Sequence, residues 1–183
     1  TGFIHGVTVG TSLIRSGVYR NVLVLGAETL SRVIDFTDRN TCILFGDGAG
    51  AVILSRAEAG SQSRVVDSYL RADGNGAALI EMPGGGSRMP ASHESVDSKS
   101  HFLRMQGKEV FKFATRSMVE LIDIALERNK LAPDDIGLVV PHQVNYRIIE
   151  AALKKIAIPP ERMLLNLLDN SFNSGFKPVT DVV

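Results

Sequence analysis

The residues of this chain best suited to chemistry surround one histidine. His142 follows the apolar residues 137–141, which are typical of a buried strand, and a helical pattern over 145–157 begins three residues later. Ligands of α/β sheets bind at the carboxyl ends of strands, and two more polar residues, Asn145 and Arg147, fall within the next turn. This convergence favours an active or binding site. The alternative is a structural histidine beside a surface helix cap.

The single cysteine, Cys42, is the other candidate nucleophile. It lies in the apolar run 41–45, where a free cysteine behaves as a small inert hydrophobe, so we interpret it as structural. A lone cysteine also excludes an intrachain disulfide and is compatible with a reducing cytosol. We expect no metal site, because the remaining histidines (His5, His93 and His101) show no metal-ligand spacing with cysteine, aspartate or glutamate.

A glycine-rich segment at residues 46–50 could be mistaken for a phosphate-binding loop. It precedes a predicted strand at 49–55 rather than a helix, so no helix N-terminus is available to hold phosphate. We predict a tight turn between two strands at residues 46–48.

The first element that must position a site is a helix over residues 3–16, where apolar residues recur at helical spacing. Gly6 and Gly10 lie one turn apart in it, and each disfavours a helix by about 1 kcal/mol relative to alanine. We therefore expect another backbone to approach this helix closely. Gly17 is the predicted C-cap.

The remaining pattern alternates strands with helices, which indicates α/β layering. Residues 57–63 are a predicted linker, and residues 72–100 a long loop of the kind that forms lids or binding sites. Strands buried on both faces are predicted at 21–28 and 137–141, other strands at 43–45, 49–55, 63–71 and 163–168, helices at 107–130 and 145–157, and a helical turn from Pro133.

Composition excludes several classes of protein. Hydrophobic residues make up 44% of the 183 residues, which excludes disorder for the chain as a whole. The formal net charge is zero, which argues against a nucleic-acid surface, and no apolar run approaches the roughly 18 residues that span a membrane. Because an uncapped helical segment opens the sequence without a leader, we expect the chain to begin inside a longer protein.

The segment around His142 also carries a family resemblance. Its sequence, PHQVNYRIIEAALKK, resembles the PHQANxRI signature of β-ketoacyl-acyl carrier protein synthase III, the initiating condensing enzyme of type II fatty-acid synthesis. Other segments occur in the order that this family shows: NVLVLGAETLSR, DFTDRNTCILFGDGAGAVIL, PGGGSR and GKEVFKFA. The resemblance covers residues 1 to about 168, and such an ordered set is far more specific than any single motif.

The resemblance implies an α/β fold of the thiolase-like type, with αβαβα layers built from two pseudo-equivalent halves. Residues 1–58 would form the later part of the N-terminal half, and residues 62–183 most of the C-terminal half. The opening and closing strands of the fold would then be missing from this chain. The family also implies a homodimer.

A Cys–His–Asn active site is implied as well. The nucleophilic cysteine is expected immediately before Thr1, where the positive end of the helix dipole would stabilise a thiolate. His142 matches the active-site histidine, and Asn173 is the best counterpart of the asparagine, with Asn170 as a rival. The alternative for this last segment, which departs from the family pattern, is a terminal turn rich in asparagine and serine.

The family pattern further implies binding residues for coenzyme A and for the acyl carrier protein. The coenzyme A positions are Arg39, Gly107, Phe111, Asn145 and Arg147. The carrier-protein positions are Lys112, Gln143, Val144, Arg147, Lys154 and Lys155. The alternatives are an ordinary loop arginine for Arg39, core packing for Phe111 and a solvated helix face for the lysines.

The implied activity is a decarboxylating Claisen condensation of an acyl-CoA primer with malonyl-acyl carrier protein, an acyltransferase reaction in the cytoplasm. Coenzyme A would enter as a thioester substrate, with no permanently bound cofactor and no nucleic-acid or membrane partner. The chain as given would be inactive alone, because its nucleophile lies outside it. The alternatives are a related condensing enzyme of polyketide or secondary metabolism, and a non-catalytic fragment.

Overall fold

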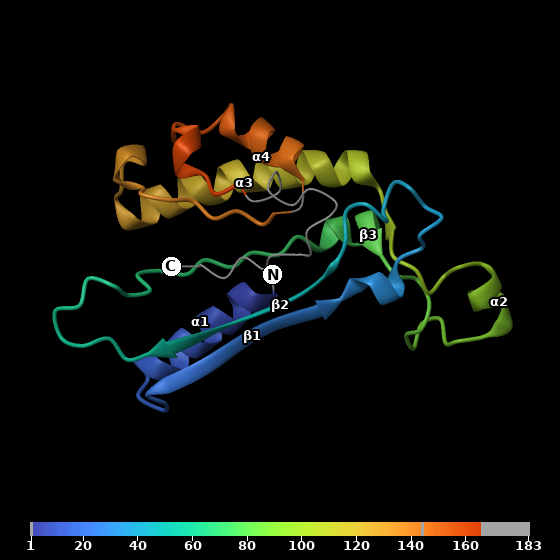
Figure 1. The fold of residues 1–183 in the computed structure, drawn as a ribbon, viewed down its shortest axis with the longest axis horizontal. Coiled ribbons are helices and arrows are strands. Elements are labelled where there is room, and N and C mark those ends of the chain that lie inside the picture. The colour runs from blue at the N-terminus through green and yellow to red at the C-terminus, as the bar shows by residue number, and fades with distance from the viewer. Residues whose placement is uncertain (1, 144, 166–183) are drawn as a thin grey trace. The chain divides into compact units, whose positions relative to one another are not determined.

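The structure, a computed structural model, describes residues 2–143 and 145–165. These residues form two compact units, which we describe separately. Unit 1 comprises residues 2–29 and 47–72, and unit 2 comprises residues 30–46 and 73–165 without residue 144. Figure 1 labels their helices and strands.

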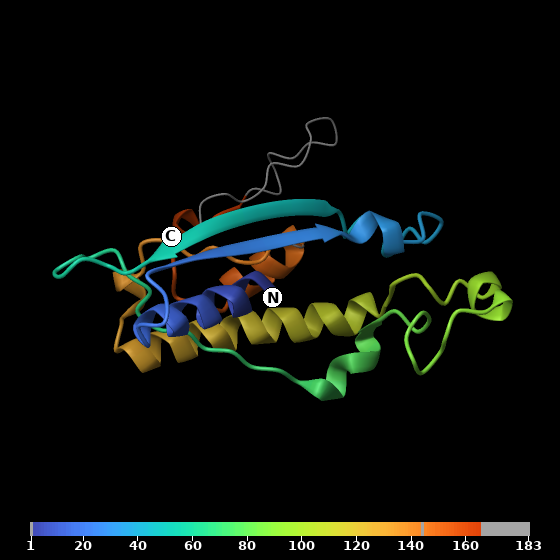
Figure 2. The ribbon, with the colours of Figure 1, turned by 90° about the horizontal axis from the view of Figure 1, so that it is seen from below.

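A helix packed on a pair of strands forms unit 1. The helix is α1 (Gly2–Arg15), and the strands β1 (Asn21–Thr29) and β2 (Asp47–Ser55) pair antiparallel along their whole length. In Figures 1 and 2, α1 runs beside this pair of strands. The helix and the two strands predicted in this region are therefore confirmed.

Two glycines allow α1 to lie close to the sheet. A Cβ atom added at Gly6 would lie 2.7 Å from Val24 Cγ1, and one added at Gly10 would lie 2.9 Å from Leu54 Cδ1. The glycines do mark a tight contact, but the nearest atoms are side-chain methyl groups, not the backbone that the sequence predicted. Gly17 ends the helix with a φ of +78°, a conformation that favours glycine, as predicted.

Only one face of β1 is covered. Val24 is 6% exposed, whereas Leu23 and Leu25 are 57% and 66% exposed. Successive side chains of a strand point to opposite faces, and α1 covers the face that carries Val24. The prediction that residues 21–28 are buried on both faces is therefore wrong for the described residues.

The glycine-rich residues 46–50 lie largely within β2 rather than in a turn between strands. Asp47 pairs with Thr29 and Gly48 with Glu28. The predicted turn at 46–48 is wrong, because β1 continues to Thr29 and supplies ladder partners for these residues. The glycines still precede no helix, in line with the rejection of a phosphate loop.

A turn occupies residues 41–44, so the strand predicted at 43–45 is wrong. The Asp38 carbonyl accepts hydrogen bonds from the N–H groups of Thr41 (3.3 Å) and Cys42 (3.0 Å). Leu44 N–H then donates to the Thr41 carbonyl at 3.0 Å. Cys42 is therefore a half-buried turn residue, not a strand residue.

Residues 63–71 also depart from their predicted strand. They form no ladder with another described segment. The guanidinium of Arg15 instead donates to the carbonyls of Val65 (2.7 Å) and Val66 (3.1 Å). The Arg15 side chain thus donates hydrogen bonds to carbonyl groups that would otherwise accept them from a neighbouring strand.

Two helices and several short elements form unit 2. The long loop predicted at 72–100 contains three of these short elements, so it is not structureless. In chain order the elements are η1 (Leu30–Val33), η2 (Gly74–Leu79), β3 (Ile80–Glu81), α2 (His93–Asp97), β4 (Arg104–Met105), α3 (Gly107–Asn129), η3 (Pro133–Asp135), α4 (Tyr146–Leu153) and η4 (Pro160–Arg162). β3 and β4 pair antiparallel. The predicted helices over 107–130 and 145–157 are confirmed, the second ending four residues early.

The core of unit 2 centres on α4, which packs against α3 (Figure 2). Ile149 and Ala152 of α4 are fully buried and Ile148 is 5% exposed. Full burial of an isoleucine side chain is worth about 1.5–3 kcal/mol. Ile158 and Met163 complete this buried set after the helix.

The segment before His142 is extended, but it is not a buried strand. Val139 forms one parallel bridge with Met163, through hydrogen bonds of 2.7 Å to the Arg162 carbonyl and 2.9 Å from Leu164 N–H. Leu138 is 55% exposed. The strand predicted at 137–141 is thus reduced to a single bridge, because pairing with 163–164 is the only ladder contact it makes among the described residues. Among these residues, no helix is both long and apolar enough to cross a membrane.

The contact between Gly6 and Val24 leads to the first prediction. Replacing Gly6 by alanine should destabilise the protein by up to about 2 kcal/mol, because overpacking costs about 1–3 kcal/mol and the gain in helix propensity offsets about 1 kcal/mol of it. Gly2→Ala is the matched control, since nothing lies within 4 Å of a Cβ added there. Thermal unfolding of both variants measures the difference. A Gly6→Ala protein as stable as Gly2→Ala would contradict the close packing.

Candidate active site

A pocket of about 370 Å³ lies within unit 2, where the first turns of α3 and α4 meet the turn at residues 38–44. Its lining is mostly apolar, with amide side chains among the polar groups. The residues are Asn40, Leu44, Met105, Gly107, Lys108, Val110, Phe111, Asn145 and Ile148. Three of the five positions that the sequence assigned to coenzyme A therefore share this pocket.

The start of α3 provides one wall. Gly107 is the first residue of the helix, and a Cβ atom added to it would lie 3.6 Å from Met105 Cε. Phe111 follows one turn later and is half-buried. The glycine keeps the backbone accessible, so a ligand can approach the helix closely at this point.

The start of α4 provides a second wall. Asn145 is the N-cap residue, and its Oδ1 accepts a hydrogen bond from Arg147 N–H at 2.9 Å. This cap fixes the orientation of the amide, and Asn145 also belongs to the pocket lining. Arg147 itself is exposed in the first turn of α4.

His142 lies three residues before Asn145 and is exposed. The neighbouring Gln143 fixes the chain beside it, because its Nε2 donates to the carbonyls of Pro141 (3.0 Å) and Leu164 (2.9 Å). The histidine is not among the pocket-lining residues. Its position after the Val139–Met163 bridge and before α4 agrees with its predicted place between an extended segment and a helix.

The turn at 38–44 forms the third wall. Its hydrogen bonds centre on Asp38, a residue that the sequence did not indicate as part of the site. Asp38 Oδ1 accepts from Asn40 N–H (3.0 Å) and Nδ2 (3.2 Å), and its Oδ2 accepts from Thr41 Oγ1 (2.7 Å). The hydrogen bond from Thr41, and then that from Asn40 N–H, hold the pKa of Asp38 below its ordinary value. An aspartate two residues before an asparagine is the sequence signal of such a turn. Arg39 lies in it and is exposed.

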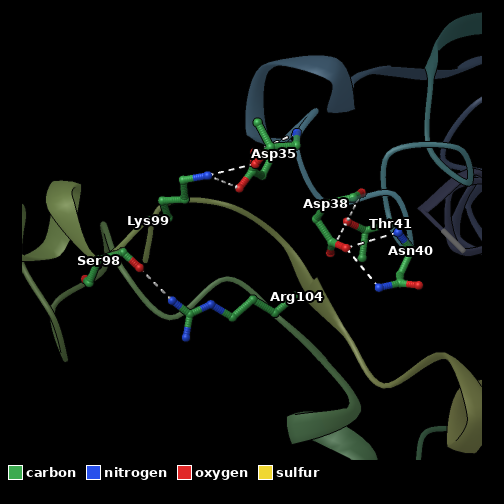
Figure 3. Close-up of polar contacts among 8 residues, drawn as sticks. Asp35, Asp38, Asn40, Thr41, Ser98, Lys99 and Arg104 are labelled. Carbon is green, nitrogen blue, oxygen red and sulfur yellow. Dashed lines mark hydrogen bonds and ion pairs between the residues drawn. The ribbon is translucent and has the colours of Figure 1, made fainter.

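A second carboxylate, Asp35, anchors the chain before this turn (Figure 3). It accepts from Lys99 Nζ at 2.7 Å, and from the hydroxyl (2.6 Å) and N–H (2.9 Å) of Thr37. The hydrogen bond from the Lys99 ammonium, followed by those from Thr37, lowers the pKa of Asp35 to about 2. The carboxylate is therefore ionised throughout the physiological range.

Two lysines of the predicted basic rim are paired within their own helices. Lys112 Nζ lies 2.8 Å from Glu109 Oε1, and Lys154 Nζ lies 3.3 Å from Glu150 Oε1. These are exposed pairs of the kind that contributes little to stability. Lys155 is exposed beyond the end of α4.

Two predicted positions, Val144 and Asn173, lie outside the described residues, as does Asn170, the rival of Asn173. Among residues 2–143 and 145–165, no group of three or more histidine, cysteine, aspartate or glutamate side chains could hold a metal ion. One of the other histidines has a structural contact: His101 Nε2 lies 2.8 Å from Ser95 Oγ.

Comparison with known proteins identifies the fold class first. The chain superimposes on a crystal structure of 3-oxoacyl-[acyl-carrier-protein] synthase III from Aquifex aeolicus with a TM-score of 0.76 and 40% sequence identity, over 91% of this chain and 48% of that one. The predicted thiolase-like α/β fold class is thereby confirmed.

The family follows from the sequence matches. Residues 1–89 match the family described as 3-oxoacyl-[acyl-carrier-protein (ACP)] synthase III, and residues 126–174 match its C-terminal part. The chain belongs to this family, as the resemblance predicted.

Two curated relatives show the extent of the match. β-Ketoacyl-[acyl-carrier-protein] synthase III of Caldanaerobacter subterraneus subspecies tengcongensis is 50% identical over 167 residues, and that of Solibacter usitatus is 46% identical over 168 residues. Both alignments cover 91% of this chain but 50% and 51% of the relatives. The chain thus spans about half the length of the curated relatives it matches.

The bonding of Asp35 leads to a prediction about pH. Its folded-state pKa of about 2 is below the ordinary 3.8, so its ionised form stabilises the fold above pH 3.8, and this contribution disappears as the pH falls through about 2. Asp35→Asn should therefore reduce the free energy of unfolding at neutral pH, with a difference from wild type that vanishes toward pH 2. Urea unfolding at a series of pH values measures it, with Asp123→Asn on α3 as control. A difference that persisted unchanged at pH 2 would refute the assignment.

Proposed function

We propose that the whole protein catalyses the decarboxylating condensation of an acyl-CoA primer with malonyl-acyl carrier protein, the step that starts fatty-acid synthesis. The observation that carries this proposal is the pocket shared by Gly107, Phe111 and Asn145, three positions at which the family pattern implies contact with coenzyme A. Family membership supports the same activity.

The composition of the pocket suits the pantetheine arm of coenzyme A. That arm is a flexible chain with methyl groups and two amides, so it needs apolar walls with a few hydrogen-bonding groups. Leu44, Val110 and Phe111 supply apolar surface, while Asn40 and Asn145 supply amides. The exposed Arg39 beside Asn40 could stack its planar guanidinium on the adenine.

In the proposed chemistry, a cysteine expected immediately before Thr1 attacks the primer thioester. Its sulfur takes the acyl group, and coenzyme A leaves as the thiol. The positive end of α1 would favour the thiolate form of this cysteine. Cys42 is not proposed for this role, because it is a half-buried turn residue.

His142 and Asn173 are proposed to act in the second half-reaction. Malonyl thioester loses CO2, and the electron pair of the broken bond forms an enolate whose oxygen carries negative charge. N–H groups of the imidazole and the amide would stabilise that oxygen, a contribution worth about 3–4 kcal/mol for a well-placed donor. The enolate carbon then attacks the acyl-cysteine to give the 3-oxoacyl product and free the cysteine.

The acyl carrier protein is proposed to dock around the start and end of α4. Arg147 and Lys155 are exposed there, and cationic groups attract acidic carrier proteins. Lys112 and Lys154 would contribute less, because each already pairs with a glutamate of its own helix. Gln143 and Val144 are also proposed as contact residues for the carrier protein.

Three further properties belong to this proposal. Residues 1–58 and 62–183 would fall in the two halves of the thiolase-like fold, the whole protein would be a homodimer, and it would act in the cytoplasm. Coenzyme A thioesters and acyl carrier protein would be its substrates, with no resident cofactor. A condensing enzyme of polyketide synthesis would use the same pocket with another primer, so primer preference measured across acyl-CoA chain lengths separates the two.

His142 provides the first test of the mechanism. In the full-length protein, His142→Ala should reduce malonyl decarboxylation by about 10²–10³-fold, because an enolate donor is lost, while acylation of the cysteine continues. Radiolabelled primer transfer and CO2 release measure the two half-reactions separately. His93→Ala, which removes another exposed histidine, is the control and should affect neither. Loss of acylation alone would refute the proposed role.

Arg147 tests the docking proposal. Arg147→Glu should raise the KM for malonyl-acyl carrier protein by about three- to tenfold, since it reverses an exposed charge at the rim. The helix should tolerate the change, because a glutamate in the first turn of α4 suits the helix dipole. Arg64→Glu makes the same charge change at an exposed position of unit 1 and is the control. An unchanged KM in the Arg147 variant would remove this residue from the rim.

A further inference from the structure

Two walls of the pocket come from chain segments more than 60 residues apart. Asn40 and Leu44 belong to the turn at 38–44, and Met105, Gly107 and Phe111 belong to β4 and the start of α3. Neither segment is part of an extended sheet in unit 2. Their separation, which sets the width of the pocket, must therefore be fixed by other contacts.

The wall formed by the turn at 38–44 is anchored by two aspartates. Asp38 holds both the N–H and the side-chain amide of Asn40, which sets the direction of that amide in the pocket lining. Upstream, Asp35 binds the hydroxyl and N–H of Thr37. Asp35, Thr37 and Asp38 thus form one rigid polar turn that ends in the pocket.

The wall formed by β4 and the start of α3 is anchored to the chain just after α2. Arg104 Nη2 donates to the Ser98 carbonyl at 3.0 Å, and Arg104 and Met105 together form β4. The chain passes from there directly into Gly107 and α3. The residue that follows Ser98 is Lys99.

Lys99 joins the two anchors (Figure 3). Its Nζ donates to Asp35 Oδ2 at 2.7 Å and to Thr37 Oγ1 at 2.8 Å. A backbone hydrogen bond of 2.8 Å from Leu103 N–H to the Val33 carbonyl runs between the same segments. We call the group Lys99, Asp35 and Thr37 the clasp.

The backbone of Lys99 has a conformation that is uncommon for lysine. Its φ is +56°, in the left-handed region where glycine or asparagine usually ends a helix. A lysine is the less favourable choice at this position. The two hydrogen bonds of its ammonium give a physical reason for a lysine there.

We propose that Lys99 is a positioning residue for the pocket, whose ammonium, bound to Asp35 and Thr37, holds the turn at 38–44 and the start of α3 at their working separation. It would affect ligand binding without touching the ligand. This inference rests on the proposed function for the identity of the ligand, coenzyme A.

The size of the effect follows from exposure. The Lys99 side chain is 53% exposed and that of Asp35 is 17% exposed, so water and salt screen their attraction. Asp35 stays ionised at neutral pH, and Thr37 provides a second acceptor that holds the ammonium in place. A modest, salt-sensitive contribution to binding is therefore expected, with no effect on the chemical step.

The test is Lys99→Met in the full-length protein. Titration calorimetry with coenzyme A should show a Kd raised by about threefold, as expected for an exposed pair, with a similar rise in the KM for acyl-CoA and an unchanged kcat. Lys99→Arg, which keeps the charge, should restore most of the affinity. The difference between wild type and Lys99→Met should shrink as NaCl is raised, because salt screens the clasp.

Two further variants make the result specific. Lys130→Met is the matched control, because Lys130 is another lysine in the left-handed conformation (φ +54°), at the end of α3. It should leave Kd unchanged. Thr37→Val removes one acceptor of the Lys99 ammonium and keeps the ion pair with Asp35, so it should raise Kd by a smaller factor than Lys99→Met. If Lys99→Met does not fold, Thr37→Val tests the same proposal.

Hydrogen exchange in the absence of ligand separates the two proposals. Amides of residues 38–44 and 105–111 should exchange faster in Lys99→Met than in Lys130→Met. Unchanged exchange together with an unchanged Kd would overturn the positioning role. Faster exchange in a protein whose wild type does not bind coenzyme A would support the clasp and refute the proposed function.

Discussion

The packing of α4 against α3 is the interaction on which the rest of the candidate site depends. One side of α4 is almost completely buried at Ile148, Ile149 and Ala152. This contact brings the first turns of α3 and α4 together. Helix N-termini leave N–H groups without intrahelical partners. Asn145 satisfies one of them with its side chain and, from the same position, takes part in the pocket lining.

Carboxylates organise the part of the site that helices do not reach. Residues 35–41 have no regular secondary structure, so their backbone groups need other partners. Asp35 and Asp38 meet that need with short hydrogen bonds, and both carboxylates are easier to ionise as a result. A loop built in this way can present Asn40 and Arg39 in a defined geometry, although it contributes little apolar surface to the core.

The contact between α1 and the sheet in unit 1 depends on shape complementarity instead of polar contacts. Gly6 and Gly10 remove side chains from the contact face of α1, so Val24 and Leu54 fit into the space. The opposite face of β1 and β2 carries Leu23, Leu25 and Ile53, all more than half exposed. The sequence of β1 is therefore more apolar than its one covered face requires, which is why the strand was predicted as buried on both faces.

Local signals determined the longer helices, the paired strands of unit 1 and the family. Helical periodicity located α1, α3 and α4, Gly17 marked the end of α1, and the ordered motifs identified the family. The sequence did not predict which distant groups would pair. Asp47 and Gly48 continue the ladder with β1, Arg15 donates to the carbonyls of residues 65–66, and Lys99 binds Asp35. Each of these depends on a partner far along the chain, and no local propensity encodes which distant group will be brought within hydrogen-bonding distance. The tertiary structure alone decided that Gly107, Phe111 and Asn145 share one pocket, because burial of α4 on α3 sets that distance.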